Sequence, residues 1–119
     1  MGGKKIVDLE AKLFDPEKRG CRSVLVGPRK VGELDYEIRE DGRVRMKIGL
    51  RGVRVLEGAG RVAILINGEQ VLELDATSGK GYLRLDDAHG DTVPAVELGD
   101  AVEARVGETV IGQGEFRRD

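Results

Sequence analysis

Short apolar stretches separated by glycine-centred turns fill the chain from Val44 to Phe116. Strands at about 8–12-residue spacing, with turn residues between them, are typical of antiparallel sandwiches and barrels. No window of about eleven residues keeps an apolar face at helical spacing without a glycine break. The pattern predicts one domain over residues 1–119, an all-β antiparallel β-sandwich, Ig-like or related, with about seven to nine strands and essentially no helix. The turns are Asp41-Gly42, Asn67-Gly68, Ser78-Gly79, Gly99-Asp100 and Gly107-Glu108.

The first predicted strand is Lys5–Phe14, in which apolar and charged residues alternate. Alternation of this kind places one face against the core and the other in solvent. The charged face is typical of a protected edge strand, which has a neighbour on one side only. We expect that such an edge can also pair with a second copy of the chain. A short apolar run at Ser23–Val26 predicts a further strand, ended by Gly27-Pro28.

The clearest hairpin joins Glu33–Arg39 to Arg43–Leu50. A two-residue loop at Asp41-Gly42 would place the apolar residues of the two strands on opposite faces. A three-residue loop, with Gly42 in the left-handed conformation, places them on one face, and we predict this loop. It pairs Ile38 with Val44, Tyr36 with Met46, Glu37 with Arg45 and Asp35 with Lys47. The basic stripe at residues 43–47 then serves cross-strand charge pairing rather than phosphate binding.

Three further turns predict hairpins. Asn67-Gly68, the strongest short hairpin signal, follows Val62–Ile66, which is apolar at every position and is expected to be covered on both faces. A two-residue loop at Ser78-Gly79 predicts that Leu74 pairs with Leu83 and Leu72 with Leu85. The last hairpin turns at Gly107-Glu108 and continues over Thr109–Phe116. Residues 17–50 and 57–86 also contain matching residues at a fixed offset, which suggests that these two segments are a duplicated unit.

The composition describes a well-solvated surface. The formal net charge is −2 with 35% charged residues, and the aromatic residues are two Tyr and two Phe without Trp. Proteins that bind single-stranded nucleic acid use aromatic stacking platforms in a basic groove, so no nucleic-acid partner is expected. No stretch approaches the ~18 apolar residues of a membrane span, so no membrane association is expected either. No signal peptide is visible, which predicts a cytoplasmic protein, or a secreted one if the chain is a trimmed mature form.

A set of turn and core motifs covers the second half of the chain. This set resembles a pattern in uncharacterised bacterial proteins that are loosely similar to chordin-type (CHRD) β-domains. The resemblance spans about Leu34 to Phe116 and lacks the paired His-containing segment of CHRD domains, since His89 is the single histidine. It implies a β-sandwich, and it implies neither a catalytic residue nor a ligand. The motifs are Ile66-Asn67-Gly68, Val71, Gly81 to Asp86, Gly90 to Val96, Gly99-Asp100 and Gly112 to Phe116.

Four residues of one predicted loop form the candidate binding site: Asp86, Asp87, His89 and Asp91. Oxygen-rich loops of this kind hold Ca²⁺, which takes about six to eight oxygen ligands. Their spacing fits no EF-hand, and one His among Asp residues fits no structural zinc site. The alternative is a solvated acidic turn that ends one strand and begins the next. We assign no metal on the spacing alone.

Motifs for catalysis are weak in this sequence. Gly58 to Ala63 matches GxGxxA, but a strand rather than a helix is expected to follow it, against the dinucleotide-binding fingerprint. A catalytic Cys21 or a serine nucleophile would need a histidine base, and nothing ties His89 to either. Cys21 is expected as a small buried thiol and, being the one cysteine, excludes an intrachain disulfide. We therefore expect no enzyme activity and no cofactor.

Charge is distributed unevenly along the chain. Residues 39–61 carry mostly basic side chains, whereas residues 86–108 carry mostly acidic ones. Such asymmetry suits a charged protein partner or head-to-tail association, unless the charges neutralise one another across strands. The leading prediction is a non-enzymatic structural or protein-interaction domain, with a homo-oligomer formed through edge strands as one expected form. The alternative is a small-ligand or Ca-type metal-binding domain that uses the Asp86–Asp100 loop.

Overall fold

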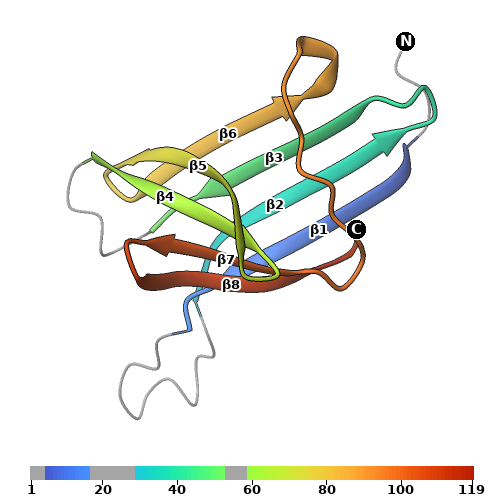
Figure 1. Cartoon of the computed structure of the whole chain (residues 1–119). Helices are drawn as coiled ribbons and strands as arrows, with labels where there is room; N and C mark the ends of the chain where they lie inside the picture. The colour runs from blue at the N-terminus through green and yellow to red at the C-terminus, as the bar shows by residue number, and fades with distance from the viewer. Residues whose placement is uncertain (1–4, 17–28, 53–58) are drawn as a thin grey trace.

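The computed structural model describes residues 5–16, 29–52 and 59–119. They form eight strands and one short 3₁₀ turn, η1. Figure 1 shows the strands wrapped around a common interior, with the β7–β8 hairpin beside β1. The elements are β1 Lys5–Phe14, β2 Lys30–Arg39, β3 Val44–Leu50, β4 Ala59–Ile66, β5 Glu69–Thr77, β6 Lys80–Asp86, η1 Asp87–His89, β7 Ala101–Val106 and β8 Thr109–Arg118.

The strands close into a single antiparallel barrel in the order β1-β2-β3-β6-β5-β4-β7-β8. The predicted β-sandwich is therefore wrong, while the all-β composition is confirmed. The prediction failed at β1, which pairs with β2 on one side and with β8 on the other. β1 is not an edge strand, so its charged face is the solvent face of the barrel wall. Self-association through an edge at β1 has no structural basis, because both of its sides are occupied.

The β2–β3 hairpin has the predicted register. Ile38 pairs with Val44 and Tyr36 with Met46. Gly42 has φ +90°, the left-handed conformation that the three-residue loop requires. The apolar residues of both strands consequently face the barrel interior, and their charged residues face solvent.

The core is built from the inward positions of the strands. Alternation fixes these positions, because successive side chains of a strand point to opposite faces. In β4, four of the five apolar residues Val62–Ile66 are buried and Ala63 is half-buried, which confirms that both faces are largely covered. The largest fully buried apolar side chains are Phe116, Leu13, Leu34, Met46, Ile48, Ile64, Val31, Val62 and Val102.

The seam that closes the barrel lies between β1 and β8. Glu10 pairs with Arg117 and Phe14 with Gln113. Between these pairs, the backbone of Gly114 passes so close to β1 that a Cβ at this position would overlap the carbonyl oxygen of Lys12. A residue without a side chain is therefore required for β8 to approach β1.

The β5–β6 hairpin opens shortly after its turn. Ser78 and Gly79 both have positive φ, as a type I′ turn requires, so the predicted two-residue loop is confirmed. However, the ladder contains two pairs, Thr77 with Lys80 and Ala76 with Gly81, so the predicted pairing of Leu74 with Leu83 is wrong. At Gly81 a Cβ would lie 3.0 Å from the Asp75 carbonyl oxygen, and the absence of one lets β5 bend across β6. Figure 1 shows the two strands separating from their shared turn.

Some predictions fall outside the described residues. The strand at Ser23–Val26, the thiol of Cys21 and much of the first duplicated segment belong to this group, so the duplication stays a prediction. In the described part of the chain, no helix is long and apolar enough to cross a membrane.

Candidate functional site

The side of β6 that faces β5 has no strand partner beyond Gly81. We call this stretch, Tyr82–Leu85, the open flank. On its other side β6 pairs with β3 along its length, from Gly81 with Leu50 to Asp86 with Arg45. The last pair of the β5–β6 ladder, Ala76 with Gly81, is a non-hydrogen-bonded pair and is closed by the Tyr82 N–H, which donates to the Asp75 carbonyl. Beyond this bond, β5 and β6 share no residue pair. The open flank is thus an unpaired strand edge in an otherwise closed barrel.

The turn geometry identifies which backbone groups point toward the open flank. In a two-residue type I′ hairpin, the residues that flank the loop exchange both hydrogen bonds, and alternate residues of each strand then point the same way. Lys80 is such a residue, so the N–H and C=O groups of Tyr82 and Arg84 point away from β3. The β2–β3 turn gives the same result: the Arg39 N–H donates to Arg43 at 2.9 Å, which leaves Met46 and Ile48 to bond Leu85 and Leu83.

Apolar side chains line the open flank without being fully covered. Leu83 and Leu85 face the interior from β6, and both are only half-buried, whereas Ile48 on the neighbouring strand is fully buried. Leu72 on β5 and Val93 on the β6–β7 connection pack against the core in the same half-buried way. The barrel therefore presents apolar surface at the place where its hydrogen-bond ladder is interrupted.

The outer face of the open flank is basic. Arg84 lies directly opposite Lys47 in the β3–β6 ladder, a like-charge pair that destabilises a sheet. Within the described residues, no carboxylate lies within ion-pair distance of Arg84. Continuing the β5–β6 register would place Glu73 opposite Arg84, but Glu73 instead binds Arg61 Nη1 at 3.1 Å. Tyr82, beside Arg84 on this face, is 65% exposed.

Asp86 ends β6 as a buried acceptor. Its side chain is 1% exposed, and Arg43 covers it with hydrogen bonds from Nε at 3.1 Å and Nη2 at 2.7 Å. Arg45 Nε donates to Oδ2 at 3.1 Å, and the Ala88 N–H donates to Oδ1 at 3.0 Å. The hydrogen bonds from Arg43 hold the pKa of Asp86 well below its ordinary value, against the opposing effect of burial. The predicted pair of Arg45 with Glu37 is present at 3.5 Å. The pairs of Arg43 and Arg45 with Asp86 were not predicted.

The other three predicted binding residues follow Asp86 in the connection to β7. The Asp87 carboxylate accepts the Val44 N–H at 3.0 Å, and the Asp91 carboxylate accepts the Asp86 N–H at 3.0 Å. His89 is exposed on η1. Among the described residues, these four do not supply a group of three ligand atoms within 4.8 Å of one another. Ligand binding by this loop stays a prediction, and three of its carboxylates already have structural partners.

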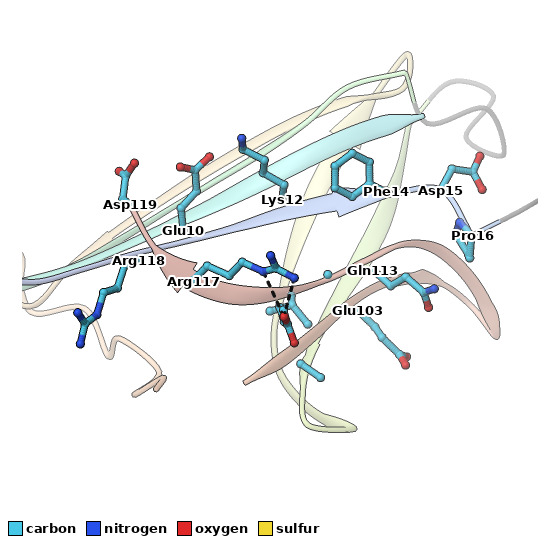
Figure 2. A pocket seen from close by; sticks show the side chains of 14 residues that line it. Glu10, Lys12, Phe14, Asp15, Pro16, Glu103, Gln113, Arg117, Arg118 and Asp119 are labelled. Atoms are coloured by element: carbon cyan, nitrogen blue, oxygen red, sulfur yellow. Dashed lines mark hydrogen bonds and ion pairs between the residues drawn. The ribbon is translucent and has the colours of Figure 1, made fainter. Parts of the chain in front are cut away.

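A groove of about 930 Å³ lies on the outer wall, where β1 meets the β7–β8 hairpin. Figure 2 shows Phe14 and Gln113 along it, with Glu103 on the β7 side. Its charges are mixed, and Arg117 pairs with Glu115 at 2.9 Å. This groove therefore does not select one class of ligand.

Three carboxylates gather beside the groove. One oxygen each of Glu10, Asp35 and Asp119 lies within 4.8 Å of the others, and Glu10 is directly opposite Asp35 in the ladder. Burial raises the pKa of Glu10, as do Glu33 and Asp119; burial also raises the pKa of Asp35. The cluster brings together one ligand atom from each of three carboxylates, an arrangement that is common among exposed acidic groups without an ion, so we assign no ion here.

The acidic cluster predicts a pH-dependent effect of Glu10→Gln. A carboxyl whose pKa is raised in the folded state costs stability once it ionises, and the cost is absent below its unfolded pKa of about 4.3. We expect Glu10→Gln to raise the melting temperature by about 1–4 °C at pH 7 and to have no effect near pH 4. Thermal unfolding at both pH values measures this. Glu40→Gln, in the exposed β2–β3 turn, is the matched control, and an equal gain in both variants would contradict the account.

Two comparisons with known proteins identified no relative of this chain. Neither the scan against protein-family models nor the search of curated proteins gave a match. The resemblance to chordin-type domains stays a prediction, and the sandwich that it implied is not the fold of this chain. Sequence reasoning also missed the open flank. The sequence alone gives no signal for it, because the opposition of Lys47 and Arg84 depends on the β3–β6 pairing, which only the structure shows.

Proposed function

We propose that this chain is a non-enzymatic protein-interaction domain that binds an extended segment of a partner protein along the open flank. The interruption of the β5–β6 ladder after two residue pairs is the observation that carries the proposal. Addition of a strand to an exposed sheet edge is a recurring mode of peptide recognition, in which main-chain hydrogen bonds supply affinity. The C=O group of Tyr82 and the N–H and C=O groups of Arg84 are placed to make such bonds.

The half-buried apolar residues support the same proposal. An added strand would cover Leu83 and Leu85 with its own inward side chains and so complete the wall. Full burial of a large aliphatic side chain contributes about 1.5–3 kcal/mol to the free energy of folding or binding. Leu83 and Leu85 are half-buried, so an added strand would provide part of this free energy. The unpaired backbone groups and the half-buried side chains of β6 therefore both favour an added β-strand.

The proposal is tested by selecting binders from a displayed library of short random peptides. We expect peptides whose binding is lost on Arg84→Pro but retained on Arg84→Gln. Proline removes the Arg84 N–H that points to the open flank, and edge positions of sheets tolerate proline. Thermal unfolding establishes that both variants remain folded.

Two outcomes would contradict the proposal. One is a library without binders, or with binders that the proline variant retains. The other is a concentration-dependent increase in solution mass, by light scattering, that Arg84→Pro abolishes, because it would make a second copy the occupant of the open flank. Pairing of β6 with its own copy would bring Arg84 near the Lys80 and Arg84 of the other chain, and like charges across a ladder oppose this.

A further inference from the structure

We infer that the segment bound at the open flank is acidic, with a carboxylate at the position opposite Arg84 and apolar side chains at the inward positions. This inference rests on the proposed function and specifies the chemistry of the partner. It comes from the order of charges across the outer wall, where Arg84 of β6 has no carboxylate within ion-pair distance among the residues that the structure describes.

The charges form a sequence from strand to strand. In one row of the ladders, Glu10 lies opposite Asp35, Asp35 opposite Lys47, and Lys47 opposite Arg84. Asp35 is the acidic neighbour of Lys47, and the next position beyond Arg84 is the empty side of the open flank. A carboxylate there would place an opposite charge directly beside Arg84, which stabilises a cross-strand pair.

The protein's own β5 shows which residue type fits this position. In the hairpin register, Glu73 would lie opposite Arg84 if the ladder continued beyond Ala76 and Gly81. Glu73 and Asp75 are instead bound to Arg61 of β4, at 3.1 Å and 3.2 Å. Glu73 is thus held on the β5 side of the opening by Arg61. The position opposite Arg84 is then left for a carboxylate from another chain.

The two edges of the opening are not equivalent. The β5 edge carries Glu69, Glu73 and Asp75, whereas the β6 edge carries Lys80 and Arg84. On β5, Arg61 already neutralises two of the carboxylates. An acidic segment is therefore attracted to the cations of β6, whereas β5 carries no cation to bind it, and this favours the β6 side of the opening.

The test measures binding of two labelled synthetic peptides by fluorescence anisotropy. The first has the sequence of Glu69–Thr77, and the second carries Lys in place of Glu73 and Asp75. We expect the acidic peptide to bind wild-type protein up to about ten-fold tighter than the lysine peptide, because the pair of Glu73 with Arg84 changes sign. Asp75 would lie opposite Tyr82. On Arg84→Glu protein the preference is expected to disappear or reverse, and on wild-type protein high salt is expected to reduce it.

The outcomes separate this inference from the proposed function. Equal affinity for the two peptides, with binding of both lost on Arg84→Pro, would overturn the acidic preference and leave strand addition standing. Failure of both peptides to bind, while a library-selected peptide still binds the open flank, would also overturn it. If no peptide of any kind depends on the open flank, the proposed function itself fails. A preference that persists on Arg84→Glu would place the acidic segment elsewhere.

Discussion

Gly114→Ala is expected to destabilise this protein more than any other single substitution considered. A Cβ at this position overlaps the Lys12 carbonyl oxygen, a backbone atom that cannot rotate away as a side chain does. Relief requires β8 to move from β1 at the seam that closes the barrel. We expect a loss of about 3 kcal/mol or more, and hence a fall in melting temperature of about 10 °C or failure to fold.

The matched control is Gly49→Ala. Gly49 also lies in a strand, β3, but nothing lies within 4 Å of the Cβ that alanine would add. We expect its effect to be within about 0.5 kcal/mol, or slightly stabilising because alanine restricts the unfolded chain. Chemical denaturation of the two variants measures the difference. Equal stability of the two variants would show that β8 does not close against β1 as described.

Asp86→Ala is expected to have the second largest effect. The substitution removes a buried carboxylate that accepts hydrogen bonds from Arg43, Arg45 and the Ala88 N–H. Arg43 then loses its carboxylate partner while it stays close to Arg45, which keeps Glu37 at 3.5 Å, and η1 loses its N-terminal cap. Removing one partner of a buried ion pair is strongly destabilising, and we expect the melting temperature to fall by roughly 10 °C.

The pH dependence distinguishes this ion pair from a simple packing contribution. The pKa of Asp86 is lowered in the folded state, so its contribution is fully present above the unfolded pKa of about 3.9 and is lost as the pH falls below it. We therefore expect the difference in melting temperature between wild type and Asp86→Ala to be constant above pH 5 and to shrink below pH 4. A difference that is the same at pH 7 and pH 2.5 would assign the effect to packing.

The local structure of this protein could be predicted where a turn fixed the register. The three-residue loop at Gly42 was the one choice that put the apolar residues of both strands on one face, and it determined the pairs from Ile38 with Val44 onward. The same logic identified the two-residue turn at Ser78-Gly79, which has the positive φ values of a type I′ turn. In both cases a local conformational requirement and the side-chain alternation agree.

Barrel closure could not be predicted in this way, because it depends on contacts between the two ends of the chain. A charged face on β1 is expected both for an edge strand and for the outer wall of a barrel. In the structure β1 is part of the outer wall of a barrel, because Gly114 has no side chain and β8 can therefore approach β1. A glycine inside a strand is a signal of close backbone approach, but the sequence does not say which backbone approaches.

The open flank was missed for a related reason. The turn at Ser78-Gly79 suggested that β5 and β6 stay paired along their whole length. Instead, β5 pairs with β4 along its length, where Arg61 of β4 forms an ion pair with Glu73 of β5. Its ladder with β6 ends at Gly81. The burial of Asp86, one residue of the predicted loop site, could not be predicted either, because its partner Arg43 is far from it in the sequence. Competition between two possible strand neighbours is a tertiary effect that alternation alone cannot resolve.

Residue-resolved amide hydrogen exchange of the β6 backbone tests the open flank most directly. Strand amides that bond a neighbour exchange slowly, and unpaired ones exchange quickly. We expect the amides of Leu83 and Leu85, which bond β3, to be protected, and that of Arg84 to exchange quickly until a library-selected peptide protects it. Equal protection of Leu83, Arg84 and Leu85 in the free protein would show that β6 is paired on both sides and would contradict the proposed function.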